Sequence, residues 1–375
     1  MKPRASAPGV FAFFRLRLIW LGFAVFMFPF ARPILAQADD PCAPENSVLA
    51  QPVSWNIEEG RRVLAPGQLF GEQDATRVAA GHVLRLGDRF RMYYWGAGND
   101  GFNRICIAES PVDDPNAWEP VGIALERQPD SEYNSIGPGF PFVLPRDDGP
   151  WLMYYCGWGE PPEPGRVNNS TGVALSDDQG LTWRYHETHP VLPFDQPYDQ
   201  QGTGSVWVVR SGDVYEMFYT SLSNYYAKPE GVVTGHGDVI PDIGIGYARS
   251  TDGLVWEKPL KHLLLTPRRF GALPYEYIVS KPCIIRDGAG FRMWVNTFSD
   301  HYRIRSLWSP NGKNWVWNAS CAVGELGVGP EGAFDDEQRS YLSVVKDGDV
   351  YHGWYTGNQY GLEGIGYLTG RVETQ

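Results

Sequence analysis

The sequence predicts an all-β fold, a five-bladed β-propeller built of four-stranded antiparallel blades. Three observations predict it: a composition rich in turn-forming and aromatic residues, a strand-turn-strand pattern that recurs five times, and an incomplete last repeat. The 375 residues include 43 Gly, 30 Pro, 14 Trp, 20 Tyr and 18 Phe. Such a composition is typical of many short strands joined by tight turns, with little helix.

The repeat is clearest in an aromatic-rich hexapeptide that we assign to the second strand of each unit. These hexapeptides cover residues 90–95, 151–156, 215–220, 291–296 and 351–356. Their third positions are Met92, Met153, Met217, Met293 and Gly353, which by subtraction are 61, 64, 76 and 60 residues apart. This spacing suits a four-stranded blade with one long loop.

A turn containing Gly or Asp precedes each hexapeptide, as in Leu86-Gly-Asp-Arg, and an apolar strand precedes each turn. We expect hairpins at these turns and innermost strands before them. Two later turns, at 176–183 and 250–256, resemble the Asp-box of sialidases. We interpret them as structural, because an Asp side chain can cap its own hairpin.

The fifth unit ends after its third strand, at about residue 369, and lacks the Trp-containing strand of the other units. Trp55 and Val63-Leu64 near the N-terminus copy the missing pattern. The sequence therefore predicts that an N-terminal strand within 52–64 closes the last blade, which removes open sheet edges. The predicted blades are roughly 65–126, 127–193, 194–265, 266–323, and 324–371 plus 52–64.

The first 38 residues have the order of a secretory signal peptide: basic residues, an apolar run over 18–30, and small residues ending at Ala38. Cleavage after Ala38 is expected, an uncleaved anchor being the alternative. We therefore divide the chain into a signal peptide over 1–38 and a propeller over 39–375, and expect a secreted or periplasmic protein.

Charge and cysteine content narrow the partners. Losing residues 1–38 removes five of the 32 basic residues, so the mature balance is 27 minus 44, or −17. This negative charge argues against nucleic acid as a partner and against an anionic membrane beyond the signal segment, and it favours a neutral or cationic ligand. Nothing in the sequence implies a protein partner. Cys106, Cys156 and Cys283 are expected to be buried thiols, which leaves Cys42 and Cys321 as candidates for a disulfide.

Carboxylates precede several innermost strands at similar offsets from the aligned hexapeptides. They are Asp74, Asp199 (followed by Gln200), Glu276 and Asp336, with Asp130 slightly further upstream in the second unit. In an up-and-down blade these positions converge on the propeller axis, so we expect several carboxylates in one axial pocket. Crowded carboxylates differ in pKa and can divide the roles of acid and base, which is the requirement of glycoside hydrolysis.

The loops that cover this end are rich in aromatic and amide groups, which suit sugar rings. We predict substrate contacts from Trp95, Trp158, Tyr225 and Tyr226. Arg77, Lys281 and Arg339 lie near the starts of innermost strands, and Arg339 has either a substrate carboxylate or a neighbouring Asp as its partner. His236 and His301 lack metal-ligand spacing, so no cofactor is expected, and only a structural cation in the axial channel is left open.

The segments 194–219 and 276–294 resemble those of five-bladed propeller glycosidases, the group of arabinanases, xylosidases, levansucrases and invertases. The resemblance covers nearly all of 51–371. It implies that Asp74 is the base or nucleophile, that Glu276 donates the proton, and that Asp199 or Asp130 tunes the acid. We expect an exported glycoside hydrolase or transglycosidase that acts on a poly- or oligosaccharide. The alternative is a non-catalytic carbohydrate-binding propeller, and a third, weaker alternative is a sialidase relative.

Overall fold

The structure is a computed structural model that describes residues 52–57, 60–187, 189–267, 275–317 and 325–372. The predicted signal peptide, Cys42 and Cys321 lie outside these residues. The described chain is all-β, with one 3-10 turn, η2 (Gly71–Gln73), and one short helix, α1 (Asn358–Gly361). Within it, no helix has the length and apolar character needed to cross a membrane.

Two sheets have four antiparallel strands each, in chain order, as the repeat predicts. One contains β3 (Arg77–Leu86), β4 (Arg89–Ala97), β5 (Asn103–Pro111) and β6 (Glu119–Leu125). The other contains β7 (Gly137–Leu144), β8 (Trp151–Gly159), β9 (Asn168–Ser176) and β10 (Arg184–Tyr185).

A third sheet has seven strands, which form two antiparallel groups. The two groups are joined by one parallel residue pair, Ile243 with Ile278. The first group contains β11 (Gly202–Ser211), β12 (Val214–Ala227) and β13 (Val239–Ser250). The second contains β14 (Ile278–Asp287), β15 (Gly290–Phe298), β16 (Tyr302–Ser309) and β17 (Val316–Trp317).

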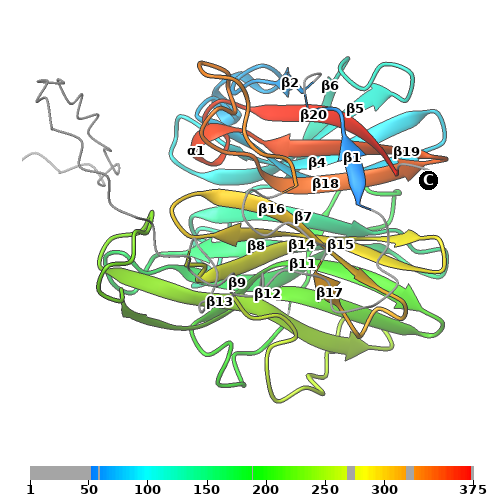
Figure 1. Cartoon of the computed structure of the whole chain (residues 1–375). Coiled ribbons are helices and arrows are strands. Elements are labelled where there is room, and N and C mark those ends of the chain that lie inside the picture. The colour runs from blue at the N-terminus through cyan, green and yellow to red at the C-terminus, as the bar shows by residue number, and fades with distance from the viewer. Residues whose placement is uncertain (1–51, 58–59, 188, 268–274, 318–324, 373–375) are drawn as a thin grey trace, which may run out of the picture. The chain divides into compact units, whose positions relative to one another are not determined.

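The last sheet joins both ends of the described chain. It contains β18 (Ser340–Asp347), β19 (Val350–Thr356) and β20 (Ile365–Val372), and both β1 (Val53–Trp55) and β2 (Arg61–Leu64) pair with β20. Figure 1 shows the blue strand β1 beside the red and orange strands of this sheet. The predicted closure by the segment around Trp55 is thus confirmed at the level of strand pairing.

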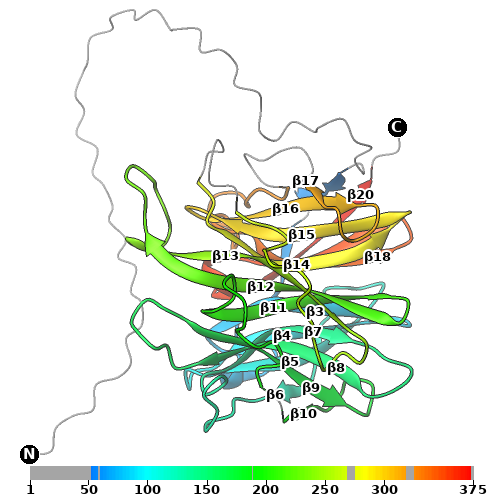
Figure 2. The same ribbon diagram turned by 90° about the horizontal axis from the view of Figure 1, so that it is seen from below.

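The first strands of the five antiparallel groups contact one another in cyclic order: β3, β7, β11, β14, β18 and back to β3. Figures 1 and 2 both place β11 and β14 next to each other. Each first strand shifts register near its start, for example between Ala79 and His82 in β3. A polar side chain of the preceding group binds the backbone at this shift, as when Asn296 Oδ1 accepts the Tyr341 N–H at 2.7 Å.

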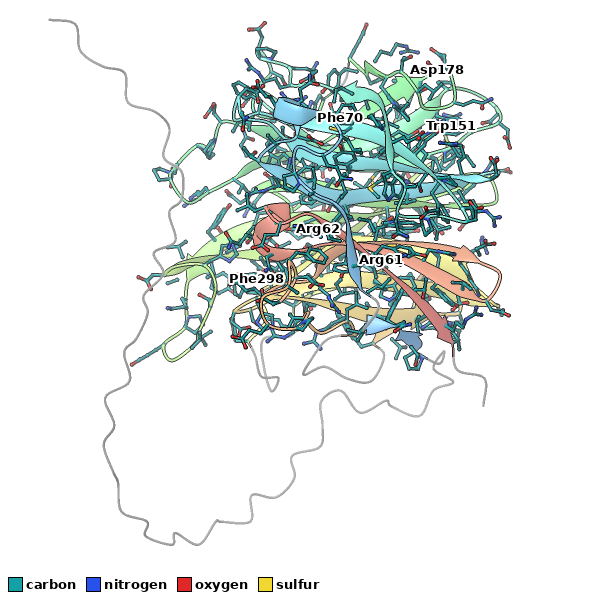
Figure 3. The ribbon with its side chains drawn as sticks, turned by 90° about the horizontal axis from the view of Figure 1, so that it is seen from above. Arg61, Arg62, Phe70, Trp151, Asp178 and Phe298 are labelled. Carbon is teal, nitrogen blue, oxygen red and sulfur yellow. The ribbon has the colours of Figure 1, made fainter. Side chains whose placement is uncertain are left out.

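The hairpin turns and the Asp-box turns agree with the sequence prediction. Gly87 has φ 63°, the left-handed conformation that a tight hairpin turn requires. Asp178 accepts the backbone N–H groups of Leu181 and Thr182 at 3.1 and 2.9 Å, so its carboxylate caps its own turn. Figure 3 shows Asp178 and Phe298, the last residue of β15, toward opposite sides of the molecule.

The core is formed by the aromatic-rich second strands. Tyr94, Tyr154 and Trp294 are among its most completely buried side chains. The thiols of Cys106, Cys156 and Cys283 are free and buried, as the sequence predicts.

Candidate functional site at the propeller axis

Two of the predicted site carboxylates, and the residue beside a third, belong to one repeated structural motif. Asp74 accepts a hydrogen bond from the Tyr94 hydroxyl at 2.8 Å, and Asp199 accepts one from Tyr219 at 3.1 Å. In the last group the same bond joins Tyr355 to Asp335 at 2.7 Å. The repeated position there is Asp335, the neighbour of the predicted Asp336.

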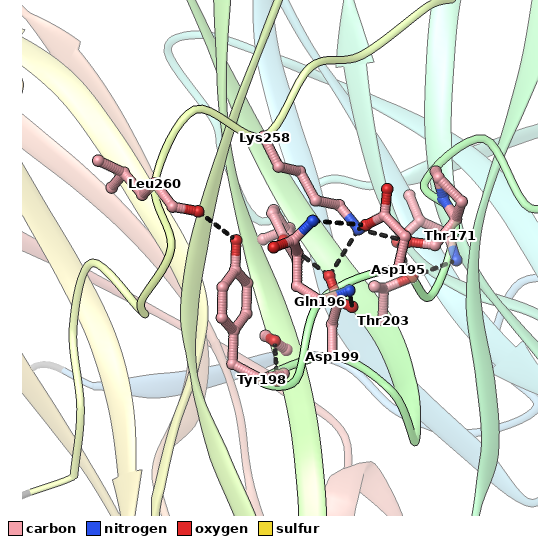
Figure 4. A network of polar contacts seen from close by, with 11 residues as sticks. Thr171, Asp195, Gln196, Tyr198, Asp199, Thr203, Lys258 and Leu260 are labelled. Atoms are coloured by element: carbon pink, nitrogen blue, oxygen red, sulfur yellow. Dashed lines mark hydrogen bonds and ion pairs between the residues drawn. The ribbon is translucent and has the colours of Figure 1, made fainter.

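Asp199 lies in a dense polar network (Figure 4). Its side chain is fully buried, accepts the Gln196 N–H at 2.9 Å, and forms an ion pair with Lys258 at 2.5 Å. Lys258 also contacts Asp195 at 2.9 Å. Since the chain itself supplies donors to both Asp199 oxygens, this carboxylate stabilises the loop before β11.

Asp74 is also fully buried, and burial raises the pKa of its carboxyl group. The Tyr94 hydroxyl and the Phe70 N–H, at 2.8 and 3.3 Å, oppose that rise. A carboxyl group with a raised pKa is suited to proton transfer, but this one is bound by the residues that shape its own turn.

Glu276, just before β14, is 1% exposed and pairs with Arg305 at 2.6 Å. Arg305 also donates to Thr297 Oγ1 at 3.1 Å, which fixes the guanidinium between β15 and β16. Glu276 directly precedes Tyr277 and Ile278, both of which belong to a buried aromatic cluster.

The remaining predicted polar contacts lie elsewhere. Arg339 is 2% exposed and pairs with Asp335 at 2.7 Å, so it is a structural partner and not a substrate clamp. Asp336 is held by Asn358 at 2.8 Å. Gln200 and Asp130 are exposed, and Asp130 lines an open pocket of about 620 Å³ near β6 and β10.

The structure does bring predicted aromatic residues together across the ring of first strands. We call this group the axial cluster: Arg77, Trp95, Phe140, Trp158, Tyr302, Tyr341 and Tyr360. The Trp95 and Trp158 rings are 4.9 Å apart, and Phe140 lies 4.7 Å from Tyr341 in a different sheet. Phe140, Trp158 and Tyr360 keep part of their surface exposed, so ring faces are available at this end.

Of the other predicted tyrosines, Tyr226 packs against the buried group that contains Tyr302 and Tyr341. Its hydroxyl lies 3.4 Å from that of Tyr275. Tyr225 instead accepts the Val167 N–H at 3.0 Å, and the Arg166 guanidinium lies over its ring. Tyr226 therefore adjoins the axial cluster, whereas Tyr225 fixes a neighbouring loop.

Backbone strain concentrates at the axial cluster. Six described non-glycine residues have positive φ. One of them, Gln179, lies in an Asp-box turn, and the other five are Phe140 (46°), Lys281 (43°), Tyr341 (57°), Gln359 (51°) and Tyr360 (60°). Left-handed backbone is costly for residues with a Cβ and is typically found at functional sites.

Lys281 is the second cation at this end of the axis. It is 5% exposed, and its ammonium lies 3.3 Å from the Gly81 carbonyl in β3 and 3.4 Å from the Tyr341 carbonyl in β18. Burial lowers its pKa to about 8. Its side chain therefore spans three groups of strands.

Phe140 and Tyr341 lie in the candidate site but were missed by the sequence analysis. For Phe140 a signal existed, because it precedes a proline within a first strand, at Pro141. Proline cannot donate to the sheet ladder, so such positions indicate bulges. Among the described residues, no group of three or more His, Cys, Asp or Glu side chains could hold a metal ion.

Comparisons with known proteins agree with this architecture. No family model matches the chain. It is 29% identical over 314 residues to the uncharacterized protein MT1551 of Mycobacterium tuberculosis (strain CDC 1551 / Oshkosh), covering 81% of this chain and 96% of that protein. The uncharacterized protein Rv1502 of strain ATCC 25618 / H37Rv is 28% identical over the same coverage.

Solved structures define the class of fold. A glycoside hydrolase matches with a TM-score of 0.64 at 18% identity, covering 87% of this chain and 95% of its own. A thermostable family-43 glycoside hydrolase matches at 0.57, with 15% identity and coverages of 83% and 94%. Zg3597, a family 117 glycoside hydrolase of the marine bacterium Zobellia galactanivorans, matches at 0.56, with 14% identity and coverages of 87% and 92%. The chain has the fold of propeller-type glycoside hydrolases.

Proposed function

We propose that this protein is a glycan-acting hydrolase that binds its substrate at the axial cluster. The observation that carries the proposal is the concentration of left-handed residues, Phe140, Lys281, Tyr341 and Tyr360, among ring faces at one end of the axis. Aromatic faces stack on the apolar faces of sugar rings, and strain at such a point supports a binding role.

We also infer that the five antiparallel groups are five blades. The cyclic contacts of β3, β7, β11, β14 and β18 support this, since only a closed ring lets the first and last of these strands meet. The single parallel pair between β13 and β14 then links neighbouring blades.

For catalysis we propose Glu276 as the proton donor and Asp74 as its partner, the roles that the family resemblance implies. Hydrolysis needs two carboxyl groups on either side of the glycosidic bond. A specific observation favours a second candidate, a non-catalytic carbohydrate-binding propeller: Asp74 shares its hydrogen-bonding motif with Asp199 and Asp335, and Glu276 is ion-paired.

One experiment separates the two candidates. The wild type, Glu276→Gln and Trp158→Ala are tested on a glycan panel for both binding and release of reducing ends, with Trp183→Ala at the opposite end of a blade as the matched control. If the protein is a hydrolase, the wild type and the Trp183→Ala variant release product. The Glu276→Gln variant then binds glycan without turnover, and the Trp158→Ala variant loses binding. Binding without turnover by the wild type supports the second candidate, and absence of any carbohydrate binding refutes both.

Export is proposed from residues 1–38 alone. N-terminal sequencing of the protein recovered from its native host is expected to begin at Asp39. A mature chain that begins at Met1 would contradict cleavage and favour an uncleaved anchor.

A further inference from the structure

Arg77 differs from every fully buried arginine of the described chain. Five arginines are buried, and each forms an ion pair of 2.6 to 2.8 Å with a carboxylate. These pairs are Arg91–Glu109, Arg104–Asp100, Arg292–Asp287, Arg305–Glu276 and Arg339–Asp335. The chain thus satisfies its interior cations with its own acids.

Arg77 has no such partner among the described residues. Its side chain is half-buried, and its Nε is fully enclosed with no hydrogen-bond acceptor. The guanidinium lies 5.3 Å from the Trp95 ring centre and 5.9 Å from that of Tyr360. Enclosing a cation without an anion costs free energy, so the arrangement is expected to be completed by something outside the chain.

Lys281 adds to the positive charge of this end. It is 5% exposed, and its ammonium contacts carbonyl oxygens, whereas the buried ammonium of Lys258 contacts carboxylates. Tyr341 links the two cations, because the Lys281 ammonium binds its carbonyl and its ring lies 6.4 Å from that of Tyr360, which flanks Arg77. A chain with a net charge of −12 therefore places two cations without acidic partners at its aromatic end.

We propose that the glycan bound at the axial cluster carries an anionic oxygen group, a carboxylate or a sulfate, and that Arg77 binds it. This inference rests on the proposed function and specifies its substrate class. A guanidinium flanked by aromatic rings is pre-organised for bidentate binding of an oxyanion, while the rings bind the sugar face. The net negative charge of the molecule predicts a neutral or cationic ligand, and this local geometry overrides that expectation.

The test compares charged and neutral members of matched pairs. The first pair is an oligogalacturonate and the same oligosaccharide with its carboxyl groups reduced; the second is a sulfated galactan oligosaccharide and its desulfated form. Affinity is measured by calorimetry for the wild type, Arg77→Gln and Arg77→Lys, with Arg184→Gln as the matched control. Arg184 is exposed and lies beside an Asp-box turn.

The wild type is expected to bind one charged member about 10–100-fold more tightly than its neutral counterpart. Arg77→Gln removes that preference, Arg77→Lys restores part of it, and Arg184→Gln keeps it. The pair that shows the preference identifies the anion.

Equal affinity for charged and neutral members, or a preference that survives Arg77→Gln, overturns the inference. Either result leaves the proposed function standing, because the glycan still binds. Failure of the protein to bind any carbohydrate refutes both. Unfolding curves of the variants separate loss of binding from loss of folding.

Discussion

At the scale of single residues, some buried charges are satisfied inside the protein and serve the fold. Asp199 is one of them, because Tyr219 and Lys258 bind it inside the protein. Breaking a buried ion pair leaves the other charge uncompensated, which typically costs about 3–5 kcal/mol.

Asp199→Asn is therefore expected to lower the free energy of unfolding in urea by about 3 kcal/mol while glycan affinity is retained. Asp195→Asn is the control: Asp195 also contacts Lys258 but is half exposed, so it should cost less than about 1 kcal/mol. Unchanged stability together with lost turnover would instead support a role for Asp199 in tuning the acid.

Lys281 predicts a pH dependence of stability. Burial lowers its pKa to about 8 from 10.5. Between these values the unfolded chain holds a proton that the folded chain has lost, so the contribution of Lys281 to stability rises with pH. Below pH 8 both states are charged, and the full cost of burying the charge remains.

The stability of the wild type relative to Lys281→Met is expected to rise by up to about 3 kcal/mol between pH 7 and pH 10. Urea unfolding at pH 7, 8, 9 and 10 measures this difference. Lys313→Met, at an exposed position, should show none. If the free energy of unfolding changes with pH in the same way for the wild type and Lys281→Met, the Lys281 ammonium is not desolvated in the folded protein.

At the scale of elements, closure of the last sheet depends on a short N-terminal strand. Trp55 at the end of β1 is 8% exposed, packs 5.9 Å from Trp294, and donates from Nε1 to Glu325 at 2.9 Å. Because Trp294 belongs to the neighbouring group of strands, Trp55 joins two groups as well as completing one.

Trp55→Ala is expected to lower the free energy of unfolding by about 3–5 kcal/mol, the usual cost of removing a buried Trp. Trp183→Ala, which removes a partly exposed Trp of another unit, should cost less. If Trp55→Ala and Trp183→Ala lower the free energy of unfolding equally, closure of the last sheet by β1 contributes little to stability.

Strands, turns and closure were predictable because local patterns determine them. Aromatic-rich hexapeptides such as 90–95 are buried at every position, and Gly87 supplies a turn conformation that few other residues adopt. The site was less predictable for a physical reason. Asp74 and Asp199 were predicted because they recur at similar offsets, and the structure shows that this recurrence reflects a hydrogen bond to a tyrosine that is repeated in three of the five groups.

The axial cluster lies where the blades differ. At the register shift of the first strands, Phe140, Lys281 and Tyr341 occupy equivalent places with unrelated side chains. Their left-handed backbone lies where the first strands of different groups meet, and this meeting is encoded by no local pattern. The Arg77 guanidinium lies over the Trp95 ring, and the Trp95 and Trp158 rings are 4.9 Å apart, whereas the substrate contacts expected of them stay a prediction.

At the scale of the whole molecule, the ring of first strands explains why a single end can carry function. Asp178 of one Asp-box turn lies toward the opposite side of the molecule from Phe298 (Figure 3), whose ring centre is 4.6 Å from that of Tyr302 in the axial cluster. The cyclic contacts bring residues from β3, β7, β14 and β18 to one axis although they are far apart in the sequence.

Binding of an anionic glycan at the axial cluster is tested most directly by a crystal structure of the wild type with the tightest-binding oligosaccharide of the matched pairs. We expect a sugar ring against Phe140 or Trp158, with the anionic group within hydrogen-bonding distance of the Arg77 guanidinium. An oligosaccharide bound instead in the pocket beside Asp130, or anywhere else away from the axial cluster, would contradict this expectation.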